Sequence, residues 1–310
     1  MIVKIENLVK RYGDLVALDH LNLEIEEGEI FGLLGPNGSG KTTAINCILA
    51  LLKYDKGSIR IFGKEMSDDQ YEIKKQIGIV MQNVAVLDEL TVYENIDYFC
   101  GLYVNEKEKK KKLVAEAIEF VGLEDFQKMK PKKLSGGLLR RLNIACGIAH
   151  KPRLIIMDEP TVAVDPQSRN RILEGILELN RQGSTIIYTS HYMEEVEQIC
   201  TKIAIMDHGR SIAVGTKEEL KKMIKTGETV TIEAVALEEK NLEALRNLPH
   251  VFEIDYEEQV LTVHCTGAKH NLIRVLNYLQ DEGLAFGRVF SELPTLNDVF
   301  LEITGKQLRD

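Results

Sequence analysis

The sequence of 310 residues has no apolar run long enough to cross a membrane as a helix, which needs about 18 residues. The segment "AINCILALL", residues 44–52, stops well short of that length. The first residues, "MIVKIENLVKRYG", lack the apolar centre of a signal peptide. We therefore expect a soluble, cytosolic chain, and any membrane-spanning part of its assembly would belong to another polypeptide.

The sequence also lacks paired cysteines and a surplus of basic residues. Its five cysteines are scattered without a Cys-x-x-Cys pair, at Cys47, Cys100, Cys146, Cys200 and Cys265. This distribution indicates a reducing compartment and argues against a disulfide framework or a zinc site. With 39 basic against 48 acidic residues, the net charge is -9. That balance argues against a protein dedicated to nucleic acid, and we interpret the lysine-rich run 107–112 as a solvated helix face.

What residues 1–219 do contain is a series of near-continuous apolar runs that end in polar residues. They are "IFGLLG", "IGIVMQ", "RLIIMDEP", "STIIYTSH" and "KIAIMDHG". Such runs are typical of parallel strands buried on both faces, with functional groups at their carboxyl ends. Helical patterns separate the runs, and residues 83–150 are mainly helical. The pattern predicts an α/β nucleotide-binding core with a helical subdomain inserted into it.

Residues 220–310 show a different order of elements. Their alternation reads as β-α-β-β-α-β, followed by a short helix in "TLNDVFLEIT". We therefore expect a small α+β domain after the core. The segment has no glycine-rich loop or catalytic cluster, which favours a role in regulation or dimerisation, with ligand sensing as the alternative.

The stretch "GPNGSGKTT" has the spacing Gly-x-x-x-x-Gly-Lys-Thr between a predicted strand and a predicted helix. Glycines allow backbone N–H groups to turn toward phosphate oxygens, and the helix N-terminus adds the positive end of its dipole. Lys41 would reach the β- and γ-phosphates, and the Thr42 hydroxyl would ligate Mg²⁺. The predicted phosphate-binding residues are Gly35, Pro36, Asn37, Gly38, Ser39, Gly40, Lys41, Thr42 and Thr43.

Two further stretches carry polar groups that suit the same chemistry. "LIIMDEP" is an apolar strand that ends in Asp158, placed to hold Mg²⁺ through water, and Glu159, placed to polarise an attacking water. In "LSGG", Ser135, Gly136 and Gly137 offer a hydroxyl and open N–H groups at a helix start. The alternative for this second stretch is a plain serine cap followed by flexible glycines. Two anion sites separated by a helical insertion suggest that two subunits enclose the nucleotide.

Over residues 1 to about 220, this ordered set of motifs resembles the ABC-type ATPases, the nucleotide-binding subunits of ABC transporters. "GPNGSGKTT" is similar to the family's Walker A motif, "LSGG" to its signature and "LIIMDEP" to its Walker B motif. The resemblance implies that Tyr12 stacks on adenine, and that Gln82 senses the γ-phosphate and its Mg²⁺. It further implies that Asp165 belongs to the D-loop and that His191 is the switch histidine.

Each of these four residues has a structural alternative. Gln82 and His191 could be ordinary polar groups at strand ends, Tyr12 could pack at a hairpin, and Asp165 before Pro166 could cap a helix. The chain departs from the usual family pattern at Leu138, where glutamine is usual, and in "VAVD", where "SALD" is usual. Both variants, and the tail "SELPTLNDVFLEITGKQLRD", resemble the drug-export branch of the daunorubicin-resistance type.

The resemblance implies an ATPase that needs ATP and Mg²⁺ and powers export through a separate membrane permease. The chain would lie in the cytoplasm, peripheral to the inner face of the cell membrane. Two copies, or one copy and a related ATPase subunit, would form a head-to-tail dimer around two ATP molecules, with Lys41, Glu159 and His191 in catalysis. The alternatives are an ABC ATPase that acts on ribosomes or DNA ends, and a module that binds nucleotide without hydrolysing it. Proteins of the first kind usually have two ATPase cores or long coiled-coil arms, whereas this chain has one core and no long heptad repeat. The presence of both Glu159 and His191 argues against a module that does not hydrolyse nucleotide.

Overall fold

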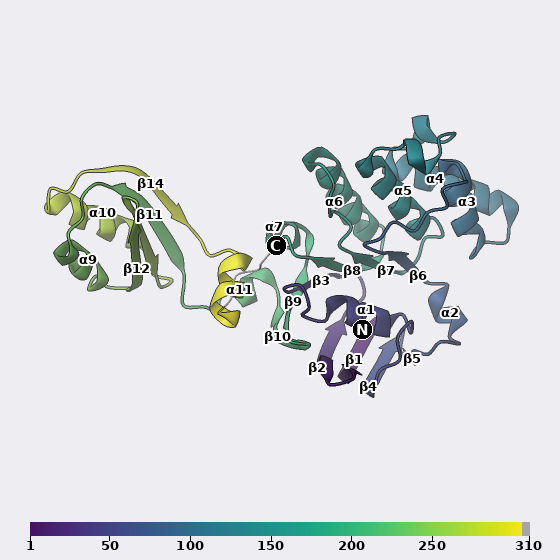
Figure 1. Cartoon of the computed structure of the whole chain (residues 1–310), viewed down its shortest axis with the longest axis horizontal. Helices are drawn as coiled ribbons and strands as arrows, with labels where there is room; N and C mark the ends of the chain where they lie inside the picture. Colours follow the sequence, from purple (N-terminus) through teal and green to yellow (C-terminus); the bar gives the residue numbers. More distant parts are fainter. Residues whose placement is uncertain (306–310) are drawn as a thin grey trace. The chain divides into compact units, whose positions relative to one another are not determined.

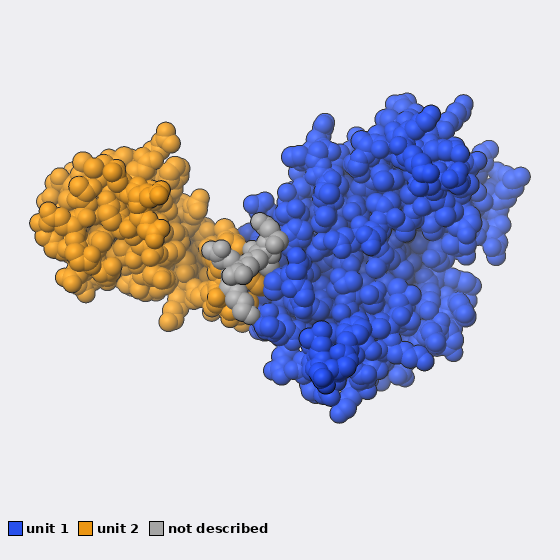
Figure 2. Space-filling model, in the orientation of Figure 1, with its two compact units in different colours: residues 1–215, 308–310 blue, residues 216–307 orange. Residues whose placement is uncertain are grey.

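A computed structural model describes residues 1–305, which form two compact units. The first unit ends at Gly215 and the second begins at Thr216, and Figure 2 shows them in blue and orange. No helix in this described range has the length and apolar character needed to cross a membrane.

The first unit contains a small antiparallel sheet with the strand order β2-β1-β4-β5. Its strands are β1 (Val3–Tyr12), β2 (Leu15–Ile25), β4 (Lys56–Ile61) and β5 (Lys64–Glu65). β1 and β2 form a hairpin in which Tyr12 pairs with Leu15, and Gly13 between them has a φ of 58°. The hairpin therefore presents Tyr12 at its tip.

The second sheet of this unit has six strands in the order β10-β9-β3-β8-β7-β6. They are β3 (Ile30–Leu34), β6 (Ile77–Val80), β7 (Leu154–Asp158), β8 (Thr185–Ser190), β9 (Lys202–Asp207) and β10 (Arg210–Gly215). All neighbouring pairs are parallel except β9 and β10. Every residue of β3, β7 and β8 is buried, which explains their unbroken apolar sequences. The five apolar runs are thus the five parallel strands.

Helices cover these sheets. The helix α1 (Lys41–Ile48) packs its apolar residues against both sheets in one core. Figure 1 shows α3, α4 and α5 grouped together, away from the small antiparallel sheet. The other helical segments of the unit are α2 (Tyr71–Lys74), α3 (Val92–Gly101), α4 (Lys107–Val121), η1 (Glu124–Phe126), η2 (Pro131–Lys133), α5 (Gly136–Ile148), α6 (Pro166–Arg181) and α7 (Met193–Ile199).

The second unit has its own antiparallel sheet, in the order β12-β13-β11-β14. Its elements are α8 (Lys217–Lys221), β11 (Glu228–Ala234), α9 (Glu239–Arg246), β12 (Val251–Glu257), β13 (Val260–Cys265), α10 (Asn271–Asp281), β14 (Phe286–Glu292) and α11 (Leu296–Thr304). Alternate residues of β11, such as Val230 and Ile232, are buried with Leu245 of α9 and Leu279 of α10 in one core. The predicted fold class, an α/β core followed by a small α+β domain, is confirmed.

Candidate functional site

The loop between β3 and α1 needs glycine at two positions where another part of the backbone comes close. Gly40 has a φ of 103°, and a Cβ atom there would lie 2.7 Å from the carbonyl oxygen of Ala17. A Cβ atom at Gly35 would lie 2.3 Å from the carbonyl oxygen of Met206. Both distances are far below ordinary contact, so the backbone of this loop can approach its neighbours only without side chains.

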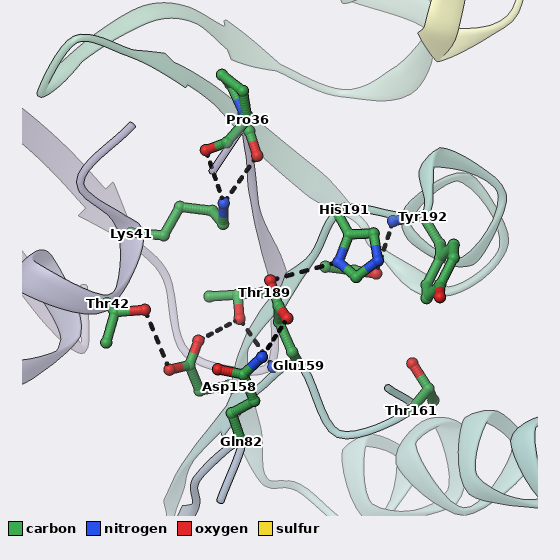
Figure 3. Close-up of polar contacts among 12 residues, drawn as sticks. Pro36, Lys41, Thr42, Gln82, Asp158, Glu159, Thr161, Thr189, His191 and Tyr192 are labelled. Carbon is green, nitrogen blue, oxygen red and sulfur yellow. Dashed lines mark hydrogen bonds and ion pairs between the residues drawn. The ribbon is translucent and has the colours of Figure 1, made fainter. Parts of the chain in front are cut away.

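Lys41 begins α1 and turns its ammonium group back over this loop. Its Nζ donates to the carbonyl oxygens of Gly35, at 2.7 Å, and Pro36, at 3.1 Å (Figure 3). Burial lowers the pKa of Lys41, against the opposing effect of Glu159 and Asp158. Its direct hydrogen-bond partners are neutral carbonyl groups, and desolvation outweighs the two carboxylates, so a bound anion would further stabilise this buried cation.

Asp158 ends β7 and is almost fully buried. Its Oδ1 accepts a hydrogen bond of 2.6 Å from the Thr189 hydroxyl, and its Oδ2 accepts one of 3.3 Å from the Thr42 hydroxyl. The carboxylate therefore joins the end of β7 to β8 and to the first turn of α1. Hydroxyl and carboxylate oxygens are the ligands that Mg²⁺ uses at phosphate sites, and Thr42 and Asp158 supply one of each side by side.

The buried hydroxyl of Ser39 gives a second indication that the loop fits a ligand. Within residues 1–305, it has no hydrogen-bond partner. A buried hydroxyl without a partner is costly, and an anion or hydrated cation held by this loop would supply one. The residues of the loop thus fit the Mg²⁺–phosphate group predicted from the sequence.

Glu159 directly follows β7 with a φ of 47°, a conformation that costs a non-glycine residue about 1 kcal/mol or more. Its N–H group donates to the hydroxyl oxygen of Thr189, at 2.9 Å, which helps to hold this backbone. Its carboxylate receives a hydrogen bond of 2.9 Å from Nε2 of Gln82, and Nδ1 of His191 lies 3.4 Å from its other oxygen. The ends of β6, β7 and β8 thus bring three predicted site residues together (Figure 3).

Gln82, Glu159 and part of the phosphate-binding loop border a cavity of about 340 Å³. Of the predicted residues, Gly35, Pro36, Ser39, Asp158 and His191 are not among those that line it. Tyr12 stands at its edge with 49% of its surface exposed, so an aromatic face is available to a planar ring. The lining residues are Tyr12, Leu15, Val16, Ala17, Asn37, Gly38, Gly40, Lys41, Thr42, Thr43, Gln82, Glu159 and His208. Sequence reasoning missed Leu15, Val16, Ala17 and His208, because no pattern marks the hairpin and the β9–β10 turn as neighbours of the loop.

Ser135, Gly136, Gly137 and Asp165 do not line this cavity. Ser135 caps α5 by accepting from the N–H of Leu138, and Asp165 caps α6 by accepting from the N–H of Ser168. Hydrogen bonds from this helix start lower the pKa of Asp165. The two caps are neighbours, since a Cβ atom at Gly137 would lie 2.4 Å from Oγ of Ser168 and 3.1 Å from Oδ2 of Asp165. In one chain, the predicted residues therefore form two separate groups.

Thr189 is a site residue that sequence reasoning missed. Its hydroxyl joins both adjacent carboxyl residues, donating to Asp158 and accepting from the N–H of Glu159. The available signal was its place in "YTSH", at the end of a buried strand and two residues before His191. A polar residue at the carboxyl end of a parallel strand lies at the edge where such sites form.

Family models match both units of the chain. The model described as "ABC transporter" matches residues 18–162, and the model described as "ATP-binding protein DrrA1-3-like, C-terminal domain" matches residues 215–304.

Full-length relatives give the same result. The chain is 40% identical over 313 aligned residues, covering 100% of both chains, to "Linearmycin resistance ATP-binding protein LnrL" of Bacillus subtilis. It is 33% identical to "Daunorubicin resistance ATP-binding protein DrrA3" of Streptomyces coeruleorubidus, with 99% of this chain and 97% of the relative covered. It is 32% identical to "Nod factor export ATP-binding protein I" of Sinorhizobium fredii, with 99% and 87% covered.

Solved structures match part of the chain. "Dimeric Structure of MJ0796, a Bacterial ABC Transporter Cassette" has a TM-score of 0.64 at 30% identity and covers 69% of this chain and 98% of that one. The same cassette is known as a dimer in "a post-hydrolysis state" bound to ADP and Pi, with the same score and coverage.

Proposed function

The chain belongs to the ATP-binding proteins of ABC transporters and is an ATPase, and from this premise we propose that it powers export through a separate membrane permease. The family predicted from the motifs is confirmed. The export direction is supported by relatives whose names refer to linearmycin resistance, daunorubicin resistance and Nod factor export. It is further supported by the DrrA-like domain after the ATPase core.

The proposed nucleotide site is the cavity beside the phosphate-binding loop. Lys41 and the N–H groups of the loop would bind the phosphates, and Tyr12 would stack on the base. Thr42 and Asp158, with Gln82 at the γ-phosphate side, would hold Mg²⁺, whose charge offsets that of the phosphate oxygens. The partnerless Ser39 hydroxyl and the buried Lys41 ammonium support this assignment.

In the proposed reaction, a water molecule attacks the γ-phosphorus and the bond to the bridging oxygen of ADP breaks. Glu159 takes up the proton of that water at its carboxylate, and His191 orients the carboxylate. The contacts of Glu159 support these roles: Gln82 donates a hydrogen bond to one carboxylate oxygen, and Nδ1 of His191, which has no hydrogen-bond partner among the described residues, lies 3.4 Å from the other.

A second subunit would complete the site. Ser135, Gly136, Gly137 and Asp165 form a separate group at the starts of α5 and α6, and a head-to-tail dimer would place this group over the nucleotide of the partner. The dimeric MJ0796 cassette supports this arrangement. The permease would contact the helical part of the first unit on the cytoplasmic side of the membrane, where Tyr98 and Leu102 of the α3 region expose apolar surface.

The test is a pull-down of the tagged chain from its native membranes, followed by an ATPase assay with and without the copurifying protein. We expect a multi-helix membrane protein that changes the ATPase rate. Lys41→Ala is the control for the assay, since it removes the phosphate-binding cation. Recovery of ribosomes or DNA without a membrane protein would instead support the non-transport alternative and overturn the proposal.

A further inference from the structure

One acidic residue outside the cavity has an unusual number of partners. Glu195 of α7 has 1% of its surface exposed. Its Oε2 accepts hydrogen bonds from the hydroxyls of Thr161, at 2.9 Å, Tyr188, at 2.5 Å, and Ser190, at 2.9 Å. Its Oε1 lies 2.5 Å from Nε of Arg169, an ion pair without the geometry of a hydrogen bond. These partners come from the segment after β7, from β8 and from the first turns of α6.

Two of these partners, Ser190 and Arg169, also contact Tyr192, the residue after His191. The Ser190 hydroxyl accepts a hydrogen bond of 3.0 Å from the N–H of Tyr192. The guanidinium carbon of Arg169 lies 4.6 Å from the centre of the Tyr192 ring, within the range of a cation–π contact. Glu195 is therefore connected to the backbone of Tyr192 through Ser190 and to its ring through Arg169.

Tyr192 in turn contacts the histidine itself. The ring centres of His191 and Tyr192 are 4.1 Å apart, with an angle of 41° between the planes. Figure 3 shows His191 with Glu159 on one side and Tyr192 on the other. With Ser190 and Tyr192 both held, the segment that carries His191 has little freedom to turn.

We infer that Glu195 is a positioning residue for ATP hydrolysis: through Arg169, Ser190 and Tyr192 it holds His191 against Glu159. The inference rests on the proposed function, because it assigns Glu195 to the reaction in which His191 orients Glu159. A buried carboxylate is costly and its ion pair adds little to stability by itself. Its charge-assisted hydrogen bonds do favour one geometry. Here that is the geometry of residues 190–192, which include His191.

The position of Arg169 adds a link to the proposed dimer interface. Its N–H donates to the carbonyl oxygen of Asp165, the N-cap residue of α6. The loop of Asp165 faces the second nucleotide in the proposed dimer.

The test uses Glu195→Gln in the full chain with its permease, measured by single-turnover ATP hydrolysis and by binding of a fluorescent ATP analogue. The variant keeps the size of the side chain but loses the ion pair with Arg169. We expect the hydrolysis rate to fall about 10- to 100-fold while the dissociation constant changes less than about twofold. The matched control is Glu194→Gln, whose side chain is 91% exposed and lies 3.8 Å from Arg169; it should keep the wild-type rate.

The decisive readout is the combination with His191→Ala, because a purely structural role of Glu195 would not depend on this histidine. If Glu195 acts through His191, Glu195→Gln lowers the rate in the wild-type background but not in the His191→Ala background. An equal fall in both backgrounds overturns the inference and leaves the proposed function standing. If His191→Ala itself keeps the wild-type rate, both the inference and the proposed role of His191 are wrong.

A second variant covers the case in which Glu195→Gln does not fold. Tyr192→Leu removes the ring between Arg169 and His191 and leaves the buried carboxylate intact. We expect the same fall in rate with unchanged nucleotide binding, and Tyr192→Phe should restore most of the rate. A wild-type rate in Tyr192→Leu overturns the inference.

Discussion

Nε2 of Gln82 lies 2.9 Å from Oε2 of Glu159, although 77 residues separate them in the chain. The contact joins the segment after β6 to the residue after β7. Because the two strands are parallel neighbours, their carboxyl ends meet at one edge of the sheet. Gln82, which is followed in the chain by the helical part of the first unit, thus bonds directly to the carboxylate of Glu159, the proposed catalytic base.

This contact predicts the effect of changing Gln82. Gln82→Ala removes a donor from Glu159, and we expect the ATPase rate of the permease complex to fall about tenfold. Gln82→Glu keeps the shape but places a second carboxylate against Glu159, so its rate should fall further. Steady-state phosphate release measures both variants. A wild-type rate in Gln82→Glu would show that the contact does not matter for hydrolysis.

Replacement of the proposed base should separate binding from hydrolysis. In Glu159→Gln the N–H bonds to Thr189 remain, so the site keeps its shape, but the side chain cannot take up a proton. We expect ATP binding near that of the wild type, hydrolysis reduced about 100-fold or more, and a dimer trapped by ATP and Mg²⁺. Light scattering gives the mass. The exposed Glu174→Gln serves as the control, and a monomeric Glu159→Gln variant in the presence of ATP and Mg²⁺ would refute the dimer proposal.

The steric role of the loop glycines gives a prediction on stability. Gly40→Ala introduces a Cβ atom that would lie 2.7 Å from Ala17 O at a φ of 103°. We expect a loss of about 3 kcal/mol in the free energy of unfolding, and loss of ATP binding. The matched control is Gly63→Ala, with a φ of 76° and open space around its Cβ position. Gly63→Ala should lose only the cost of the backbone conformation, about 1 kcal/mol in the free energy of unfolding. Equal losses in the two variants, measured by urea unfolding, would contradict the steric argument.

Much of this architecture was predictable because its sequence signals are local. The five parallel strands are buried on both faces and show it in unbroken apolar runs. The loop at Gly35 and the carboxylates at Asp158 and Glu159 follow strands directly, so their place at the sheet edge follows from strand order. The roles of these residues remain predictions until variants are measured.

The missed features depend on contacts between distant segments. The sheet β2-β1-β4-β5 joins residues 3–25 to residues 56–65, and nothing local in the sequence states that pairing. Glu195 lies in "MEEVEQI", beside the exposed Glu194, and the two carboxylates look alike in sequence. Only the packing of α7 against β8 and α6 places one of them in the interior, where Arg169 and three hydroxyls meet it.

His150 predicts how stability depends on pH. Burial lowers the pKa of its ring to about 4, although the ring bonds to Ile77 O and stacks on Tyr103. The unfolded chain, with an ordinary histidine pKa near 6.5, therefore binds more protons than the folded chain between pH 6.5 and 4. Stability from this group is present above that window and is lost as the pH falls through it, by about 2 kcal/mol between roughly pH 7.5 and 5.

Denaturant unfolding at the two pH values tests this. His150→Phe keeps a ring against Tyr103 and should show a smaller loss of stability on acidification than the wild type. His20→Asn removes an exposed histidine and should behave like the wild type. If His150→Phe loses as much stability as the wild type, the acid sensitivity arises elsewhere.

Asp165 has two possible roles, a cap of α6 and a part of the second nucleotide site, and its variants can separate them. Its side chain caps α6 through the N–H of Ser168, at 2.9 Å, so the structural alternative is present in the fold. Asparagine caps a helix about as well as aspartate, whereas alanine loses about 1 kcal/mol. If the cap were the whole role, Asp165→Asn would hydrolyse ATP at the wild-type rate and Asp165→Ala would be less stable. We expect instead that Asp165→Asn keeps the wild-type unfolding midpoint and lowers the ATPase rate about tenfold, because in the proposed dimer its carboxylate would contact the partner subunit beside the second nucleotide. Thermal unfolding and phosphate release on the same samples give both quantities, and a wild-type rate in Asp165→Asn would leave only the cap.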